Sequence, residues 1–312
     1  MSNPIKCIFC LEDKIGSEEH IFPDSIGGVL VFNEVCTKCN NELGSKVDTH
    51  LINHYLMQLA RLTKKIKGKT GKIPNPFREG MLEGKSESKV HYRFNDDGDP
   101  ESVYIVPSQE LSEDGASLKI LIDRVDEHKL PDIINKTLKR RGLPSLTKEE
   151  IDEKKQYEII PDPKINYKPS VDTNSYRKAI IKIVYELTYY WLGKKYLDDT
   201  MGSRLRNYIR SDAIDVDGIY GNAVIVDKSL ESDNFLYLLA NEDSHIGMLL
   251  IDGNNIYCTV NLFNTFQGSF LVSENAENYP YADNKFLEND VLNEQVRESA
   301  YETELLRRGY FE

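Results

Sequence analysis

Two Cys-x-x-Cys pairs constrain this chain more than any other feature of its sequence. "CIFC" holds Cys7 and Cys10, and "CTKC" holds Cys36 and Cys39 after 25 intervening residues. Each such turn delivers two thiolates to one side of a tetrahedral Zn²⁺ ion, so the spacing predicts one zinc site with four sulfur ligands. Such a site has no open position, and we expect it to stabilise the fold and take no part in catalysis. Four free or redox-active thiols are the alternative.

The segment between the two pairs carries the groups that could do chemistry. It contains "EEHIFPDSIGG" at residues 18–28, and Asn40 directly follows the last cysteine. Because zinc would draw the two pairs together, we expect Glu19, His20 and Asn40 to meet at one spot. An imidazole can act as a general base near neutral pH, and carboxylate and amide oxygens are ligands for a hard divalent cation. The alternatives are a structural histidine at position 20 and a zinc-ribbon-like adaptor that binds nucleic acid or protein without catalysis.

The charge of the chain is uneven. The net charge of −12 argues against a nucleic-acid partner, but residues 1–90 carry 13 Lys and Arg against 11 Asp and Glu. The run "RLTKKIKGKTGK" at 61–72 contains no acid. One basic face can hold phosphates on an acidic protein, although a solvated surface is the alternative. We expect DNA phosphate contacts from the six cations of this run: Arg61, Lys64, Lys65, Lys67, Lys69 and Lys72.

Hydrophobic periodicity indicates the organisation of the first half of the chain. Apolar residues that recur every three or four positions predict a helix from Asn40 to about Lys67. Alternating runs within 88–123 predict strands, and residues 128–156 are expected to be helical, with "TKEE" as a capping box. The proline-rich stretch 159–172 is typical of a boundary.

The second half predicts a long helix followed by an antiparallel meander. The helix covers 175–197, and we expect the acidic tail 285–309 to be helical. Five apolar runs between them, separated by turn signals, predict strands: "NAVIV", "NFLYLLA", "HIGMLLI", "NIYCTVNLF" and "GSFLVS".

We therefore expect an α+β fold in three parts. Residues 1–72 would form a zinc-stapled module, 73–158 an α+β intermediate region, and 159–312 a helical and antiparallel β region with a regulatory or dimerisation role. No run of the sequence approaches the roughly 18 apolar residues of a membrane helix, and the N-terminus lacks the apolar core of a signal peptide. These features favour a cytoplasmic protein with no membrane partner. Cys258 stands alone in an apolar run and is expected to be a core residue.

Taken together, "CIFC", "EEHIFPDSIGG" and "VCTKCNNELGSKVD" resemble the HNH endonucleases with a ββα-metal core. The resemblance is to the bacterial group with the pattern Cys-x-x-Cys, Glu-His-Ile-x-Pro, Gly-Gly and Cys-x-x-Cys-Asn, and it covers about residues 5–55. It implies a metal-dependent enzyme that hydrolyses phosphodiester bonds in DNA. His20 would be the catalytic general base, and Glu19 and Asn40 would hold a catalytic Mg²⁺ or Mn²⁺ apart from the structural zinc.

The resemblance has departures and leaves alternatives open. Some members carry a further histidine at the position of Gly44. Asp48 and His50 would lie about 12 and 15 Å along a continuous helix from Asn40, too far to replace it. RNA could be the substrate in place of DNA. The size of the region after residue 75 favours, by analogy, a regulated anti-phage or toxin-like effector, and a homodimer, a regulatory ligand or a partner protein stay open.

Overall fold

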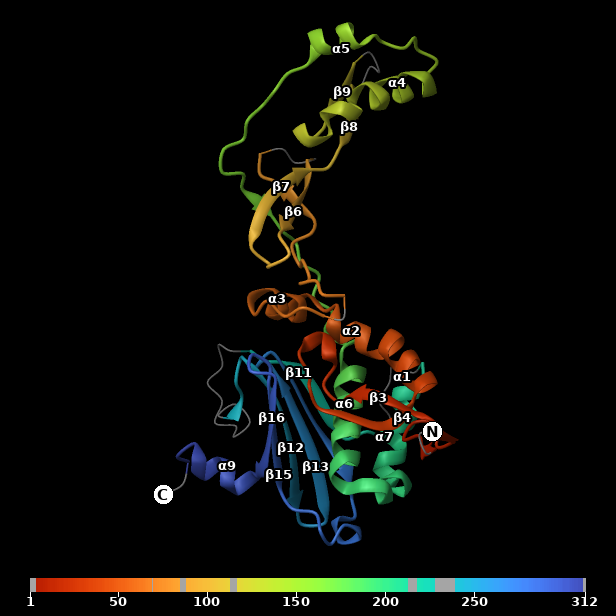
Figure 1. Cartoon of the computed structure of the whole chain (residues 1–312), viewed down its shortest axis with the longest axis vertical. Helices are drawn as coiled ribbons and strands as arrows, with labels where there is room; N and C mark the ends of the chain where they lie inside the picture. Colours follow the sequence, from red (N-terminus) through yellow and green to blue (C-terminus); the bar gives the residue numbers. More distant parts are fainter. Residues whose placement is uncertain are drawn as a thin grey trace. The chain divides into compact units, whose positions relative to one another are not determined.

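The computed structural model describes residues 4–68, 70–84, 88–112, 117–212, 218–227 and 239–310. The chain divides into two compact units, Met1–Pro74 with Ser170–Glu312 and Asn75–Pro169, which we describe separately (Figure 1). Both combine helices with antiparallel sheets, so the α+β class is confirmed. The division into three domains stays a prediction.

The first unit begins with two strands and a helix. β3 (Gly16–His20) pairs antiparallel with β4 (Val31–Cys36), and α1 (Thr37–Leu43) follows β4 without a loop. The connection between the strands contains the short helix η1 (Asp24–Ile26). Two strands flank the first cysteine pair and pair with each other: β1 (Ile5–Lys6) and β2 (Asp13–Lys14).

The single helix expected over 40–67 is wrong, because the structure breaks it at His54. His54 has an extended conformation with ψ of 136°, and its ring accepts a hydrogen bond from the Leu56 N–H at 3.2 Å. The other ring nitrogen donates to the Asp172 carbonyl oxygen at 2.7 Å, a contact that the periodicity could not foresee. The segments after α1 are the π-helix η2 (Gly44–Asp48), α2 (Thr49–Ile52) and α3 (Tyr55–Thr63).

The C-terminal part of the first unit is a six-stranded antiparallel sheet with two helices on one face (Figure 1). The helices are α6 (Arg177–Leu192) and α7 (Thr200–Arg210), joined by η4 (Gly193–Asp198). Gly247 lets α6 approach the sheet closely, because a Cβ atom there would lie 2.7 Å from Leu187 Cδ1. In sheet order the strands are β11 (Gly221–Ile225), β14 (Phe266–Ser273), β13 (Asn255–Leu262), β12 (Ser244–Asp252), β15 (Lys285–Asp290) and β16 (Gln295–Ala300).

The antiparallel meander is confirmed, but the helical tail is wrong for most of its range. β15 and β16 occupy the region, and only α9 (Tyr301–Arg307) is helical. Phe286 packs into a small core with Met248 and Leu305, which the acidic composition of the tail conceals. The short helix η5 (Ala276–Asn278) precedes these strands. The strand expected at "NFLYLLA" falls largely on residues outside the described ranges.

Over its described residues, the second unit contains two small sheets, two α-helices and the 3-10 helix η3. The capping box at Thr147 is confirmed, since its hydroxyl accepts from the Glu150 N–H and the Glu150 carboxylate accepts from the Thr147 N–H. Within the described part of the chain, every helix is too short or too polar to cross a bilayer. The elements are β5 (Gly80–Leu82), β6 (Lys89–Phe94), β7 (Pro100–Ile105), β8 (Ser108–Leu111), β9 (Leu118–Leu121), η3 (Arg124–Lys129), α4 (Leu130–Arg140), α5 (Lys148–Lys154) and β10 (Ile165–Asn166).

Candidate functional site

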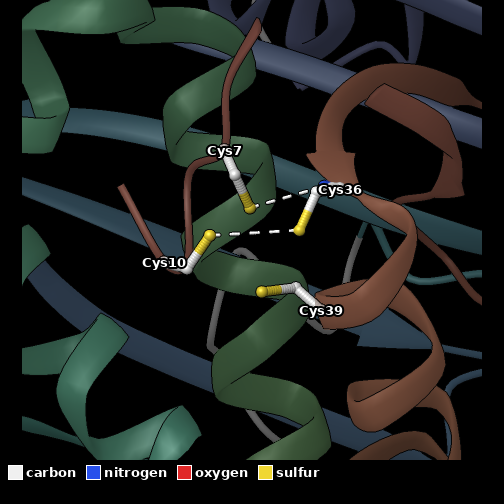
Figure 2. Close-up of side chains that lie close together, drawn as sticks. All are labelled: Cys7, Cys10, Cys36 and Cys39. Atoms are coloured by element: carbon white, nitrogen blue, oxygen red, sulfur yellow. Dashed lines mark hydrogen bonds between the residues drawn. The ribbon is translucent and has the colours of Figure 1, made fainter. Parts of the chain in front are cut away.

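The four N-terminal cysteines point toward one another, as Figure 2 shows. Their sulfur atoms all lie within 4.8 Å of one another, and the Cys10 and Cys36 sulfurs are 3.9 Å apart. A tetrahedral Zn²⁺ with bonds of about 2.3 Å requires sulfurs about 3.8 Å apart, so the group fits a zinc ion. All four are free thiols, and the chemistry of four sulfur donors favours zinc over a hard cation.

Backbone N–H groups further prepare this cluster for a cation. The Cys36 N–H donates to the Cys7 sulfur at 3.4 Å. Burial raises the pKa of the Cys7 thiol, but hydrogen bonds from the backbone of Cys36, Cys10 and Phe9 outweigh burial and lower that pKa. The cysteine at the end of β4 is thus tied to the first pair, and α1 starts from a fixed point.

A cavity of about 310 Å³ lies between the β3–β4 connection and the helical segment that begins with α1. The structure brings Glu19, His20 and Asn40 together in its wall, as the sequence led us to expect. The other lining residues are mostly polar. They are Glu18, Asp24, Ser25, Asn41, Ser45 and Asp48, together with the apolar Pro23, Gly44 and Ile52.

Asn40 is oriented by its own amide group. Its Nδ2 donates to the Glu18 carbonyl oxygen at 2.8 Å and to the Ser17 hydroxyl at 3.3 Å. Both donors are therefore used, and among the described residues nothing donates to its Oδ1 atom. The half-buried ring of His20 likewise makes no hydrogen bond to any described residue. An amide oxygen and an imidazole thus remain available to a ligand of the cavity.

Glu19 lies against a lysine that comes from the middle of α6. The side chain of Lys182 is fully buried, and its ammonium donates to Glu19 Oε1 at 2.6 Å and to Asp48 Oδ2 at 3.0 Å. Glu186, one turn further along α6, lies 3.5 Å from the same nitrogen. Neither oxygen of Glu186 makes a hydrogen bond within the part of the chain that the structure describes.

Burial and charge act in opposite directions within this cluster. Burial lowers the pKa of Lys182, but the charges of Asp48, Glu186 and Glu19 outweigh it and hold that pKa well above the usual value. Burial also raises the pKa of Glu186 well above its usual value, despite the nearby lysine. The cluster thus groups one buried lysine with three carboxylates, and burial disfavours the charged form of Glu186.

The structure places Asp48 in the wall of the same cavity as Asn40. The expectation that Asp48 is too far along the helix to replace Asn40 as a ligand stays a prediction. Eight residues of a straight α-helix would turn Asp48 roughly 80° away from Asn40 around the axis. The π-helix η2 ends at Asp48, and its wider turns rotate the chain less per residue, which reduces this angle. His50 instead lines a different cavity. Asp48 Oδ1 is buried and has no hydrogen-bond partner among the described residues.

Only part of the basic run fits the phosphate contacts expected of it. Arg61 is buried, with 6% of its surface exposed, and this placement does not fit a contact with DNA. Lys64 forms an ion pair of 2.7 Å with Asp243. The three cations Lys65, Lys67 and Lys72 are exposed. Lys69 lies outside the described residues.

Lys182 is the site residue that the sequence reasoning missed. It lies 163 positions after Glu19, so no local motif connects the two. The available signal was a Lys–Glu pair, Lys182 and Glu186, at helical spacing inside the apolar run of the helix. Charges are rarely fully buried unless they are paired, so such a pair in a predicted core helix points to a buried partner elsewhere.

Comparisons with known proteins agree with the geometry of the N-terminal module. Residues 7–56 match the family model described as HNH endonuclease. The matched segment contains all four cysteines, whose clustering fits a zinc-stapled module of that family. No curated protein and no solved structure shows a significant match to the chain.

Proposed function

We propose that the HNH module at residues 7–56 makes this chain a metal-dependent endonuclease that hydrolyses phosphodiester bonds in DNA. The observation that carries the proposal is one polar cavity whose wall contains His20, Glu19 and Asn40, in a module that also holds the four-cysteine group. An HNH module implies a nucleic-acid substrate, and we propose that this substrate is DNA.

The proposed roles follow from the chemistry of each side chain. His20, whose ring has no protein partner among the described residues, removes a proton from the attacking water. Glu19 and Asn40 offer oxygen atoms that would hold Mg²⁺ or Mn²⁺. Such a cation supplies Lewis-acid stabilisation of the charge that develops on the phosphate oxygens. The four cysteines are proposed to bind a separate zinc ion that is structural.

The donors in the cavity fit a hard cation. The amide nitrogen of Asn40 donates to Ser17 and Glu18, so its Oδ1 atom is oriented away from these two partners. Asp48 Oδ1 is buried and has no hydrogen-bond partner among the described residues. Unsatisfied buried oxygens are costly, and a bound cation or its water ligands would relieve that cost. Asp48 is thus a candidate for the cation's surroundings in addition to Glu19 and Asn40.

The test is cleavage of supercoiled plasmid by the full chain with and without Mg²⁺ or Mn²⁺. His20→Ala should lower the rate about 10²–10⁴-fold, the usual contribution of a general base, and should retain zinc. His50→Ala is the matched control, because His50 lies on the same helical segment but lines another cavity. Retained cleavage by His20→Ala would defeat the assignment.

The same assay decides between the alternatives. Cleavage of an RNA substrate with no effect on plasmid would replace DNA by RNA. Metal-independent binding without cleavage would favour the zinc-ribbon-like adaptor. Exposed Lys65, Lys67 and Lys72 are proposed to contact phosphates, which would give affinity without sequence preference. A cytoplasmic anti-phage or toxin-like effector, with a homodimer, regulatory ligand or partner protein, is the wider setting that we propose by analogy.

A further inference from the structure

One fully buried side chain at the candidate site has no part in the chemistry described above. Lys182 comes from α6, yet its ammonium lies 2.6 Å from the Glu19 carboxylate. A buried lysine loses the hydration of its charge, so its position must be fixed by partners. The partners here are Glu19 and Asp48, both of which line the cavity.

We propose that Lys182 is a positioning residue that holds Glu19 in the orientation needed to bind the catalytic cation. The proposal rests on the proposed function of the same cavity. Lys182 tethers one oxygen of Glu19, Oε1, and no other described residue donates to the Glu19 carboxylate. The second oxygen is thereby left for the cation.

The physical gain is preorganisation. A glutamate side chain has several rotamers, and fixing one of them on binding a cation costs conformational entropy. The tether fixes that rotamer before any cation arrives. Partners that orient metal-binding carboxylates in this way typically change metal affinity or activity by about 10–100-fold when they are removed.

The charge of Lys182 is balanced by Asp48, which accepts from the same ammonium at 3.0 Å. The pair leaves the negative charge of Glu19 to face the cation. Lys182 can therefore orient Glu19 without the net repulsion that an isolated lysine would exert on Mg²⁺.

Helices α6 and α7 also hold the segment between Cys7 and Cys10, so the lysine that tethers Glu19 and the first cysteine pair are fixed by the same helices. Tyr185 Oη donates to the Ile8 carbonyl oxygen at 2.7 Å, and Arg210 donates to the Phe9 carbonyl oxygen at 3.1 Å. The matched segment 7–56 thus depends on helices more than a hundred residues later in the chain for the placement of its carboxylate.

The decisive variant combines Lys182→Met with Asp48→Asn in the full chain. This pair removes the tether and leaves the net charge unchanged. Because Asp48 also lines the cavity, the comparison in a Glu19→Gln background, described below, separates the positioning of Glu19 from any contact of Asp48 with the cation. We expect plasmid cleavage at saturating Mg²⁺ to fall about 10–100-fold, with zinc content unchanged. Lys178→Met is the matched control, because Lys178 lies one turn earlier on α6 and donates to the Ser211 carbonyl oxygen instead.

A second measurement does not require cleavage. The affinity of the zinc-loaded chain for Mn²⁺, measured by electron paramagnetic resonance without DNA, should weaken by a similar factor in the pair variant. In a Glu19→Gln background, the same two substitutions should cause no further weakening, because they act through Glu19. The triple variant combines Glu19→Gln, Asp48→Asn and Lys182→Met, so neither position 19 nor position 48 carries a carboxylate without a partner. Its Mn²⁺ affinity can therefore be measured if the pair variant does not fold.

The outcomes separate this proposal from the proposed function. A pair variant that cleaves plasmid and binds Mn²⁺ like the natural chain overturns the positioning role and leaves the nuclease intact. Additive losses in the Glu19→Gln background overturn it as well. A natural chain that neither cleaves nor binds Mn²⁺ overturns the proposed function, and the positioning role with it.

Discussion

Asn40 illustrates how one residue can be prepared for a ligand by hydrogen bonds on its opposite side. Its amide nitrogen donates to the Glu18 carbonyl and the Ser17 hydroxyl. An aspartate at this position would place an oxygen against the Glu18 carbonyl oxygen, and the two acceptors would repel. The amide, rather than a carboxylate, is therefore the group that this pocket wall can orient.

We accordingly predict that Asn40→Asp lowers the free energy of unfolding by about 0.5–1.5 kcal/mol, because the hydrogen bond to the Glu18 carbonyl oxygen is lost. Cleavage should fall although a stronger anionic ligand has been introduced. Urea unfolding and plasmid cleavage measure the two effects. Asn41→Asp is the control, since it adds the same charge one residue later on an exposed side chain. Equal effects of the two substitutions would contradict this account.

At the residue scale, sequence reasoning was strongest where the determinants are local. The spacing of Cys7, Cys10, Cys36 and Cys39 was sufficient to predict the cluster that the structure contains. The presence of Asp48 in the cavity wall does not follow from spacing alone, because the π-helix η2 interrupts the continuous α-helix that the spacing assumes. Lys182 could not be assigned to Glu19, because their contact depends on the packing of α6 against the N-terminal module.

At the scale of elements, the cysteine cluster fixes the N-terminal end of α1, where no side-chain hydrogen bond from Cys36 caps the helix. Cys36 is the residue directly before α1. The helix and β4 instead meet at the cluster itself, which fixes the end of one and the beginning of the other. Zinc would therefore hold the angle between α1, which carries Asn40, and β4, whose partner strand β3 carries His20.

We predict that Cys36→Ser releases zinc and unfolds the N-terminal module. Structural zinc contributes about 10–16 kcal/mol of apparent binding free energy in small zinc domains, which matches or exceeds the whole stability of a typical domain. Zinc content and the melting temperature report the loss. Cys258→Ala is the control, because Cys258 is a buried core residue of β13 outside the cluster. A Cys36→Ser protein that keeps zinc and its melting temperature would count against a structural metal.

Element boundaries also show where periodicity alone is insufficient. The apolar stripe after Asn40 continues past His54, yet the helix is interrupted there, where His54 is extended and its ring bonds the Asp172 carbonyl oxygen. The charged residues of β15 and β16 make these strands hard to recognise in the sequence. β16 is an edge strand, where charged side chains can face solvent. Charged edges protect sheets against association, so an acidic tail can be strand as well as helix.

At the scale of the first unit, the C-terminal sheet supports the connection between β3 and β4. Asn289 of β15 accepts from the Val29 N–H at 2.8 Å and donates to the Gly27 carbonyl oxygen at 2.9 Å. His245 of β12 bonds the Ile26 carbonyl oxygen at 2.9 Å. The loop that leads away from His20 is thus fixed by residues more than 200 positions later. The C-terminal region of this unit therefore acts as the scaffold of the candidate site, whatever further role it has.

His245 makes this support sensitive to pH. Its ring is fully buried against Phe22 and Phe263, and burial lowers its pKa to about 4, aided by the charge of Lys64 and opposed by the bond to Ile26. The unfolded chain, with a histidine pKa of about 6.5, binds a proton that the folded chain excludes. Stability is therefore complete above about pH 6.5 and is lost as the pH falls toward 4, by about 3 kcal/mol for this group.

The measurement is the free energy of unfolding between pH 7 and 4, compared with that of His245→Phe. The variant loses the bond to Ile26 and should be less stable at pH 7, but its stability should fall less steeply with acid because phenylalanine takes up no proton. Carboxylates contribute to the slope in both proteins, so the difference between the slopes isolates His245. Parallel slopes would mean that the ring reaches solvent, and the β3–β4 connection would then not be docked on the sheet.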